Sequence, residues 1–159
     1  MQSPCRVGLI SDTHGLLRPA VHDAFRGVDM ILHAGDVGDN LILAELDTIA
    51  LVHAVLGNTD FPDRIALEDM IELELSGVRI HLSHGHELGS PTPAKLLEVY
   101  DADVIVYGHT HRQHLHRDGN RLVVNPGSAG ARRFNLPASV AILAISGGNV
   151  EVVFQELPD

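Results

Sequence analysis

Five short segments carry the side chains that could hold metal ions. They are Asp12-Thr13-His14, Gly35-Asp36, Gly57-Asn58-Thr59-Asp60, His84-Gly85-His86 and Gly108-His109-Thr110-His111. Carboxylates, imidazoles and one amide without thiolates argue against a structural zinc site and suit catalytic Mn²⁺, Fe, Co, Ni or Zn²⁺. Seven or eight ligands exceed what one ion uses, so we infer two divalent ions. Such a pair, roughly 3.5–4 Å apart, needs a bridging carboxylate.

Two divalent ions would also change the local charge. They bring four positive charges against two ligand carboxylates, which leaves a positive pocket on a chain of formal net charge -10. Such a pocket attracts a phosphate and lowers the pKa of bound water towards neutrality. The chemistry expected from these segments is hydrolysis of a phosphate ester by a water or hydroxide held between the ions.

Each of the five segments follows an apolar run that is typical of a buried strand. The runs cover residues 6–11, 29–33, 51–56, 78–83 and 102–107. Ligands bind beyond the carboxyl ends of strands in α/β sheets, so these five ends should converge on one cleft. Glycine recurs because the backbone must turn tightly and approach the bound group closely.

The rest of the chain predicts a mixed sheet with a few helices. Helices are expected over residues 19–26, 40–49 and 93–100, with Pro19 as a first helical residue and Asn40 as an N-cap. Gly77, Asp118-Gly119 and a Gly-Gly-Asn turn indicate three antiparallel hairpins in the second half. The pattern indicates an α/β fold in one domain over residues 1–159.

Composition narrows the class of partner. The chain is 45% hydrophobic and 20% charged, which favours a globular protein, and its acidic balance argues against non-specific binding to nucleic acid or an acidic membrane. We expect no signal peptide and no membrane span. The single Cys5 fits a reducing compartment, so a cytoplasmic location is expected.

The ordered set ISDTHG, HAGD, GNTD, SHGH and GHTH, followed by NPGS, resembles the calcineurin-like metallophosphoesterase superfamily. More narrowly, it resembles the small bacterial and archaeal phosphodiesterases of the YfcE type. The resemblance spans residues 10–128. It implies a β-sandwich with mixed sheets flanked by helices, in an α-β-β-α arrangement. It also implies a small phosphodiester substrate and two divalent ions, for which we expect Mn²⁺, with Ni²⁺, Co²⁺, Fe²⁺ or Zn²⁺ as alternatives.

The resemblance further implies a role for each candidate ligand. The first ion would be bound by Asp12, His14 and His111, and Asp36 would bridge the two ions. The second ion would be bound by Asn58, His84 and His109. Of these residues, Asp36, Asn58 and His84 are the ones we expect to act in catalysis.

One position departs from many members of the superfamily. They carry histidine in the third place of the Gly-Asn-x-Asp segment, beside the leaving group, where this chain has Thr59. Threonine cannot supply a proton usefully at neutral pH, which argues against esters with poor leaving groups. Small YfcE-type members lack this histidine too.

Simpler interpretations stand beside these. Asp12 and Asp36 could be helix N-caps, and His109 and His111 a pair on a surface turn. His86 is either a contact to substrate phosphate or a hydrogen-bond partner of a ligand. Asp60 is expected to orient its neighbours.

Two exposed features are also open. Arg132 and Arg133 belong either to a solvated loop or to a phosphate contact. His114 and His116 share one strand face, which indicates solvent exposure or a contact in a homo-oligomer.

Three hypotheses about function follow. The first is a two-metal phosphodiesterase acting on a small substrate. The second is a non-catalytic interaction module, because a protein-trafficking scaffold subunit shares this fold while lacking parts of the metal site. The third is a phosphomonoesterase or nucleotide hydrolase of the same superfamily, against which Thr59 and the short chain count.

Overall fold

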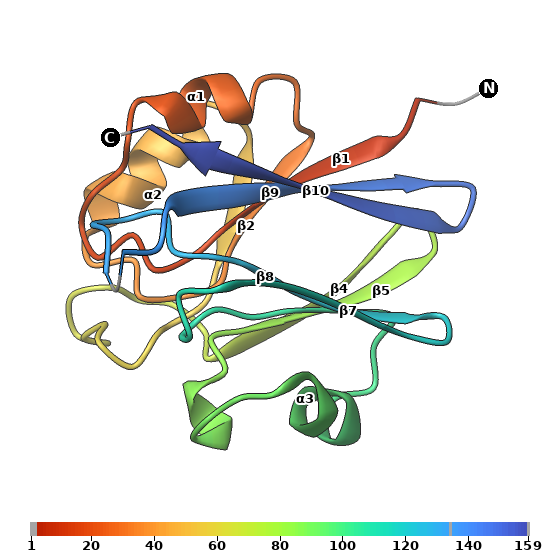
Figure 1. Cartoon of the computed structure of the whole chain (residues 1–159). Helices are drawn as coiled ribbons and strands as arrows, with labels where there is room; N and C mark the ends of the chain where they lie inside the picture. The colour runs from red at the N-terminus through yellow and green to blue at the C-terminus, as the bar shows by residue number, and fades with distance from the viewer. Residues whose placement is uncertain (1–2, 134, 159) are drawn as a thin grey trace.

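The apolar runs form strands in two sheets that pack face to face, in a computed structural model that describes residues 3–133 and 135–158 (Figure 1). The first sheet has the order β10-β9-β1-β2-β3. Its strands are β1 (Cys5–Ile10), β2 (Met30–His33), β3 (Leu51–Ala54), β9 (Ala138–Ser146) and β10 (Asn149–Leu157). The second sheet has the order β4-β5-β6-β8-β7. Its strands are β4 (Met70–Leu75), β5 (Val78–Ser83), β6 (Val104–Val106), β7 (Gln113–Asp118) and β8 (Arg121–Pro126).

Parallel pairing places several strand ends at one edge. In the first sheet β1 pairs in parallel with β2, and β2 with β3; in the second, β5 pairs in parallel with β6, and β6 with β8. The three expected hairpins, β4–β5, β7–β8 and β9–β10, are antiparallel. Their turns lie together at the right-hand end of the molecule in Figure 1, opposite the loops that follow β1 and β2.

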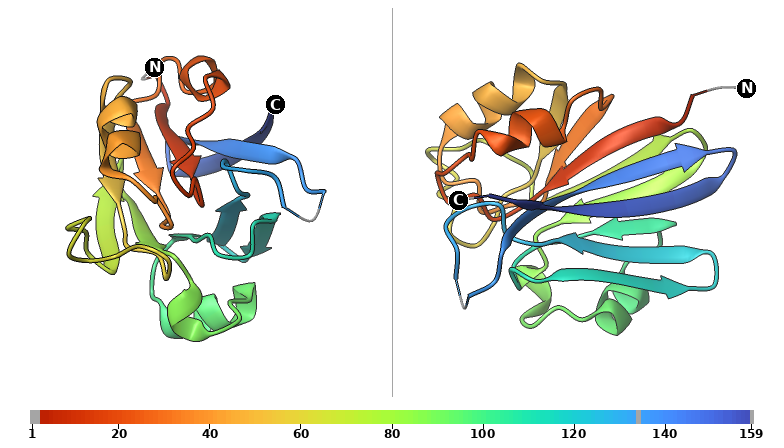
Figure 2. Two further views of the ribbon diagram at one scale, coloured as in Figure 1. Left: turned by 90° about the vertical axis from the view of Figure 1, so that its left-hand side faces the viewer. Right: turned by 45° about the horizontal axis from the view of Figure 1, so that its top comes forward.

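Helices cover the outer faces of both sheets. Helices α1 (Ala20–Ala24) and α2 (Asn40–Asp47) lie over the first sheet, and α3 (Pro93–Val99) lies under the second, preceded by the 3₁₀ turn η1 (His86–Leu88) (Figures 1 and 2). The expected α-β-β-α sandwich is therefore the observed fold. Among the described residues, no helix combines the length and hydrophobicity needed to cross a membrane.

Two helix starts differ from the prediction. The N-cap of α2 is Asp39, whose side chain accepts a hydrogen bond from the Leu41 N–H at 2.9 Å, whereas the Asn40 side chain donates to the Arg64 carbonyl. The cap falls on Asp39 because its backbone is extended, with φ of -156°. Pro19 occupies the N-cap position of α1, and that helix ends at Ala24, two residues earlier than predicted.

The apolar core has three layers that follow from strand alternation. Val7 and Leu9 point between the two sheets, where they meet residues such as Leu82 and Val106. Their neighbour Ile10 points outward into a second cluster beneath α1 and α2. A third cluster, formed by Leu96, Ile105, Val123 and their neighbours, packs α3 against the second sheet. The strands are thus fixed on both faces, which makes their ends a rigid platform.

Candidate metal centre

The loops that follow β1 and β2 run side by side. The Asp12 N–H donates to the Gly35 carbonyl at 3.0 Å, and the His14 N–H donates to the Asp36 carbonyl at 2.9 Å. These bonds continue the parallel pairing of the two strands beyond their ends. As a result, the carboxylates of Asp12 and Asp36 lie close together, and each is near Nε2 of His84.

Asp12 is at the centre of the cluster, with a side chain that is completely buried. Its Oδ1 lies 3.0 Å from Nε2 of His84, 3.4 Å from Nε2 of His111 and 3.8 Å from Nε2 of His14. Segments that are widely separated in sequence therefore meet at one carboxylate oxygen.

The other oxygen of Asp12 is held by donors. Its Oδ2 accepts hydrogen bonds from the Ser11 hydroxyl at 2.5 Å and from the His109 N–H at 3.1 Å. Burial raises the pKa of Asp12, but hydrogen bonds from His111 and His84 outweigh burial and hold the pKa well below its usual range. The carboxylate is therefore ionised and fixed in orientation.

Asp36 shares two of these histidines. Its Oδ2 lies 3.6 Å from Nε2 of His14 and 3.4 Å from Nε2 of His84, while its Oδ1 accepts a hydrogen bond from the Thr59 N–H at 2.9 Å. Asp36 is 3% exposed. One oxygen is thus tied to the backbone and the other faces both imidazoles, and the bridging role of Asp36 stays a prediction.

The His14 ring tests whether the cluster suits a metal ion. Its Nε2 is buried and has no hydrogen-bond partner among the described residues, although it points at two carboxylates. Donor atoms around one ion, each at about 2 Å from it, sit roughly 3–4 Å apart. In two groups the donor atoms all lie within 4.8 Å of one another: Asp12, His14 and His111, and Asp12, Asp36 and His84. The residues therefore fit metal binding.

Backbone strain concentrates in the same residues. Seven non-glycine residues among those described have positive φ, and five of them are predicted ligands: Asp12, His14, Asp36, His109 and His111. A positive φ is unfavourable for most side chains, and such strain clusters at functional sites. Folding therefore bends the backbone here at a cost, and the result is a set of side chains aimed at one point.

Glycine allows the loops to approach one another. A side chain at Gly57 would collide with the backbone and carboxylate of Asp36, and one at Gly108 would collide with Ser11 and Asp12. The motif glycines are therefore needed for close approach, as the sequence predicted, and not for flexibility.

The loop after β3 reaches the cluster through its backbone. Asp60 accepts hydrogen bonds from the N–H groups of Val37, Gly38 and Gly57, which fastens this loop to the one carrying Asp36. This matches the orienting role expected of Asp60. Asn58 lies exposed in that loop, one residue before Thr59, whose N–H binds Asp36.

The remaining histidines line one side of His84. The His109 ring meets the His84 ring edge-on, with centroids 5.1 Å apart, and Nδ1 of His86 lies 3.0 Å from Nδ1 of His84. His86 is therefore a direct neighbour of a predicted ligand. Burial lowers the pKa of His84, but its hydrogen bond to Asp12 and the charges of Asp12 and Asp36 more than compensate, so the pKa is raised.

A polar network lies behind His84 and was not predicted from the sequence. Glu87 accepts hydrogen bonds from the Gly85 N–H and the Tyr100 hydroxyl, both at 2.9 Å. The Tyr100 ring stacks on His81, whose Nε2 lies 3.0 Å from the Ser83 hydroxyl. His81 and Ser83 alternate with apolar residues along β5, and this alternation is a signal that could have pointed to a polar patch on its outer face.

His33, a fully buried histidine at the end of β2, supports the loop after β1. Its Nδ1 accepts a hydrogen bond from the Gly35 N–H, so Nε2 carries the proton and donates to the Thr13 hydroxyl at 3.0 Å. Thr13 in turn donates to the Val37 carbonyl. Burial lowers the pKa of His33 to about 4, which keeps the ring neutral.

Arg132 and Arg133 are exposed on the loop before β9. Burial lowers the pKa of His14, and the positive charge of Arg133 adds to that decrease. The Arg132 Nε donates to the Leu136 carbonyl at 3.4 Å. Arg133 is thus close enough to act on the cluster electrostatically, whereas a phosphate contact by either arginine stays a prediction.

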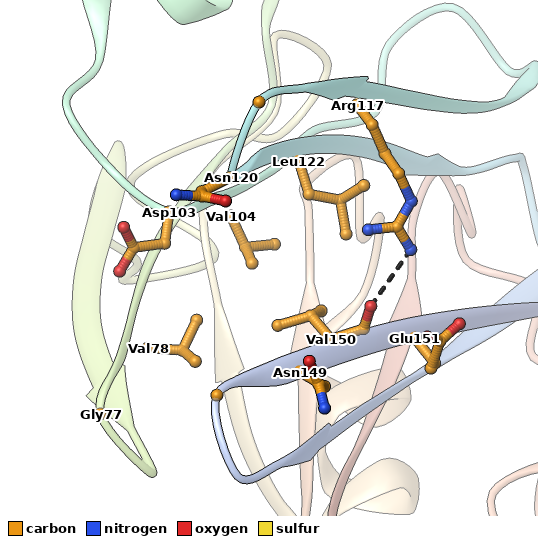
Figure 3. A pocket seen from close by; sticks show the side chains of 12 residues that line it. Gly77, Val78, Asp103, Val104, Arg117, Asn120, Leu122, Asn149, Val150 and Glu151 are labelled. Atoms are coloured by element: carbon orange, nitrogen blue, oxygen red, sulfur yellow. Dashed lines mark hydrogen bonds between the residues drawn. The ribbon is translucent and has the colours of Figure 1, made fainter.

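A cavity of about 520 Å³ opens at the other end of the sandwich (Figure 3). It lies between the three hairpin turns and includes Asp103, Arg117 and Glu151 among its lining residues. Arg117 crosses it to donate a hydrogen bond to the Val150 carbonyl at 3.1 Å. None of the predicted ligands lines this cavity.

Comparison with known proteins gives a consistent result. A probable metallophosphoesterase of Methanothermobacter thermautotrophicus is 37% identical over 91% of this chain and 88% of its own length. A phosphodiesterase of Methanocaldococcus jannaschii is 27% identical, over 77% and 82%. The crystal structure of Vps29 with zinc from Entamoeba histolytica has a TM-score of 0.75 at 24% identity, over 95% and 98% of the two chains, which shows a shared fold.

The match to a family model is equally extensive. The model of the calcineurin-like phosphoesterase superfamily domain matches residues 5–148, which include all five motif segments. The chain belongs to the calcineurin-like phosphoesterase superfamily.

Proposed function

We propose that this protein is a dinuclear metal-dependent phosphodiesterase. The observation that carries the proposal is the pair of buried carboxylates, Asp12 and Asp36, that share the imidazoles of His14 and His84. The unpaired Nε2 of His14 between them is an atom that a metal ion would satisfy. The metallophosphoesterase and phosphodiesterase names of the relatives agree with this chemistry.

In this proposal the residues divide between two ions. Asp12, His14 and His111 would hold one ion, Asn58, His84 and His109 would hold the other, and Asp36 would be shared by both. When bound, the ions lower the pKa of a water molecule and neutralise charge on the phosphoryl oxygens. Mn²⁺ suits this set of oxygen and imidazole ligands, and Ni²⁺, Co²⁺, Fe²⁺ and Zn²⁺ compete for it.

The chain itself orients the groups around the phosphate. The Thr59 N–H fixes one oxygen of Asp36, and the Ser11 hydroxyl and His109 N–H fix one oxygen of Asp12. The positive charge of Arg133 favours an anionic ligand next to His14. Thr59 offers no useful proton donor, so the enzyme is expected to prefer diesters with good leaving groups.

Metal content and hydrolysis test the proposal together. Protein stripped with a chelator and reconstituted with Mn²⁺, Co²⁺, Ni²⁺ or Zn²⁺ should bind two ions per chain, measured by elemental analysis. It should hydrolyse bis-p-nitrophenyl phosphate faster than p-nitrophenyl phosphate. The reverse preference would favour the phosphomonoesterase alternative.

Asp36→Asn tests the bridging position. Loss of this carboxylate should lower kcat for the diester by at least about a thousandfold and leave at most one ion bound. Asp63→Asn, at an exposed aspartate in the loop after β3, is the matched control and should retain activity. An Asp36→Asn variant with full activity would remove the bridging role.

The second candidate function is a non-catalytic interaction module. The similarity to Vps29 favours it, because that structure has the same fold and was crystallised with zinc. An interaction module would bind metal without turnover. A reconstituted protein that holds ions but hydrolyses none of the diesters or monoesters would support this candidate against the enzyme.

A further inference from the structure

A cavity opens directly beside the candidate metal centre. It has a volume of about 260 Å³ and is lined by His111, Arg112, Gln113, Leu136, Pro137 and Glu156. His111 is also the residue whose Nε2 lies 3.4 Å from Asp12. The His111 side chain thus belongs both to the metal cluster and to the cavity wall, which makes the cavity a direct neighbour of the cluster.

This cavity continues away from the cluster. Pro137 and Glu156 also line a second cavity of about 370 Å³, together with Arg132, Leu157 and Pro158. The two cavities form what we call the side groove, which lies between the start of β7, the loop before β9 and the end of β10. In Figure 2 the end of β10 and the loop before β9 lie at the same end of the sandwich.

The lining of the side groove combines three kinds of surface. Leu136, Pro137 and Leu157 provide apolar contact, and Gln113 and Glu156 provide hydrogen-bonding groups. Among the described lining residues, Arg112 and Arg132 carry guanidinium groups and Glu156 carries a carboxylate. The groove therefore offers cationic hydrogen-bond donors beside a carboxylate acceptor.

The Arg132 side chain is attached to the groove wall. Its Nε donates to the Leu136 carbonyl at 3.4 Å, so the base of the guanidinium is fixed on the loop before β9. Arg18 holds the neighbouring backbone, because its guanidinium donates to the Gly130 carbonyl at 3.0 Å and to the Pro158 carbonyl at 3.4 Å. The loop and the C-terminal strand end are thereby joined, which gives the groove a fixed shape.

We propose that the side groove binds a nucleotide that forms one substituent of the phosphodiester substrate. This rests on the proposed function, since the scissile phosphate sits at the metal cluster. A nucleobase can pack on the leucine and proline surfaces while its edge pairs with Gln113 and Glu156. The guanidinium fork of arginine matches phosphate oxygens. A simple alkyl or aryl substituent would leave the polar groups of the groove unused.

The experiment compares a nucleotide substrate with one that lacks a nucleotide. The substrates are the 5′-phosphorylated thymidine dinucleotide and bis-p-nitrophenyl phosphate, each with the Mn²⁺-reconstituted protein. Arg112→Ala should raise KM for the dinucleotide about tenfold through loss of a charge-assisted contact. It should leave kcat for the dinucleotide and KM for bis-p-nitrophenyl phosphate within about twofold of their original values.

Two further variants keep the test decisive. Arg26→Ala removes an exposed arginine just after α1, where it pairs with Asp23, and should change neither KM. Gln113→Leu preserves the size of the side chain and should also raise KM for the dinucleotide only. It supplies the answer if thermal denaturation shows that Arg112→Ala unfolds.

A binding measurement separates this proposal from the proposed function. Titration of the dinucleotide into metal-free protein, followed by NMR chemical shifts, should perturb Gln113 and Leu136, and Arg112→Ala should weaken that binding at least threefold. Hydrolysis of bis-p-nitrophenyl phosphate without dinucleotide binding, or an equal rise in both KM values, overturns the nucleotide proposal alone. Failure to hydrolyse any ester with any metal overturns the proposed function instead.

Discussion

The two ends of the sandwich are built from the same strands, yet they differ in how their backbone turns are made. At one end three hairpins close with Ser76-Gly77, Gly119-Asn120 and Gly147-Gly148. At the other end, the loops after β1, β2 and β6 place aspartate and histidine at positive φ. Positive φ in a tight hairpin follows from turn geometry, and glycine adopts it at little cost, so Ser76 is the one non-glycine residue at positive φ in these three turns.

The difference shows where backbone strain at non-glycine residues positions side chains that could act in function. The hairpin end follows local rules that any antiparallel sheet must obey. At the end with the candidate metal centre, which we call the metal end, five charged or titratable residues adopt positive φ. The side chains of Asp12, Asp36, His84 and His111 are also buried there. Such conflict between local preference and observed structure is expected where function, not stability, selects the residue. The predictions below test this contrast, from the largest effect to the smallest.

The largest effect is expected from Asp12→Asn. An amide lacks the charge that Nε2 of His84 and of His111 face, so metal content should fall and kcat should drop by at least about a thousandfold. Glu151→Gln makes the same carboxylate-to-amide change in the cavity at the hairpin end. It should leave metal content and kcat within about twofold of their original values. A comparable loss in Glu151→Gln would erase the contrast between the ends.

Metal binding should raise the stability of the protein through the metal end and not through the hairpin end. A ligand at a thousand times its dissociation constant adds about 4 kcal/mol of stability, or roughly 10 °C in Tm for a chain of this size. Differential scanning calorimetry of the metal-free protein with and without Mn²⁺ measures the shift. Asp12→Asn should abolish the shift, while Glu151→Gln should preserve it. A shift that survives in Asp12→Asn would place the ions elsewhere.

The next effect is a pH dependence that arises from His33. Its pKa is lowered from 6.5 in the unfolded chain to about 4 in the fold, because burial disfavours the charged ring. The unfolded state therefore binds more protons between these values, and stability is lost as pH falls from 6.5 to 4. The loss amounts to about 3 kcal/mol at 1.36 kcal/mol per pKa unit.

His33→Gln should make this decline shallower, as measured by urea denaturation of the metal-free protein at pH 7.5, 6 and 5. His116→Gln, at an exposed histidine on β7, is the matched control and should keep the original slope. An unchanged slope in His33→Gln would show that the acid sensitivity comes from other histidines.

Short-range patterns predicted a mixed sheet and the meeting of the strand ends, whereas the α-β-β-α sandwich was implied by the family resemblance. Apolar runs that end in Asp-x-His or His-x-His have a local signature, and parallel pairing brings such ends to one edge. The choice of Asp39 over Asn40 as the cap of α2 did not follow, since both residue types cap helices and only the backbone angle decides.

The Glu87–Tyr100 contact could not be predicted for a different reason. Twelve residues lie between the two in the sequence, and their hydrogen bond depends on how α3 packs against β6 and β8. His81 carried too little information alone, because its role appears only when Tyr100 stacks on it. Distances such as the 3.6 Å between His14 and Asp36 likewise exist only in the folded chain.

The smallest effect is expected at this contact, which lies behind the metal end without touching an ion. Tyr100→Phe removes the hydroxyl group that donates a hydrogen bond to Glu87. It keeps the aromatic ring that stacks on His81. Glu87 then holds the Gly85 N–H less firmly, and Gly85 links His84 to His86. Because loss of a direct hydrogen-bond partner of a metal ligand typically weakens metal affinity tenfold or more, this indirect contact should cost about threefold.

Isothermal titration calorimetry with Mn²⁺ measures this change, and the visible spectrum of the Co²⁺ form reports ligand geometry independently. Tyr107→Phe is the matched control, because it removes a hydroxyl from the other tyrosine that packs in the cluster beneath α3. An equal loss of affinity in Tyr107→Phe would mean that packing of the second sheet, and not the Glu87 contact, positions His84. A Co²⁺ spectrum that shifts in Tyr100→Phe alone would extend the strained, functional end of the sandwich outward as far as α3.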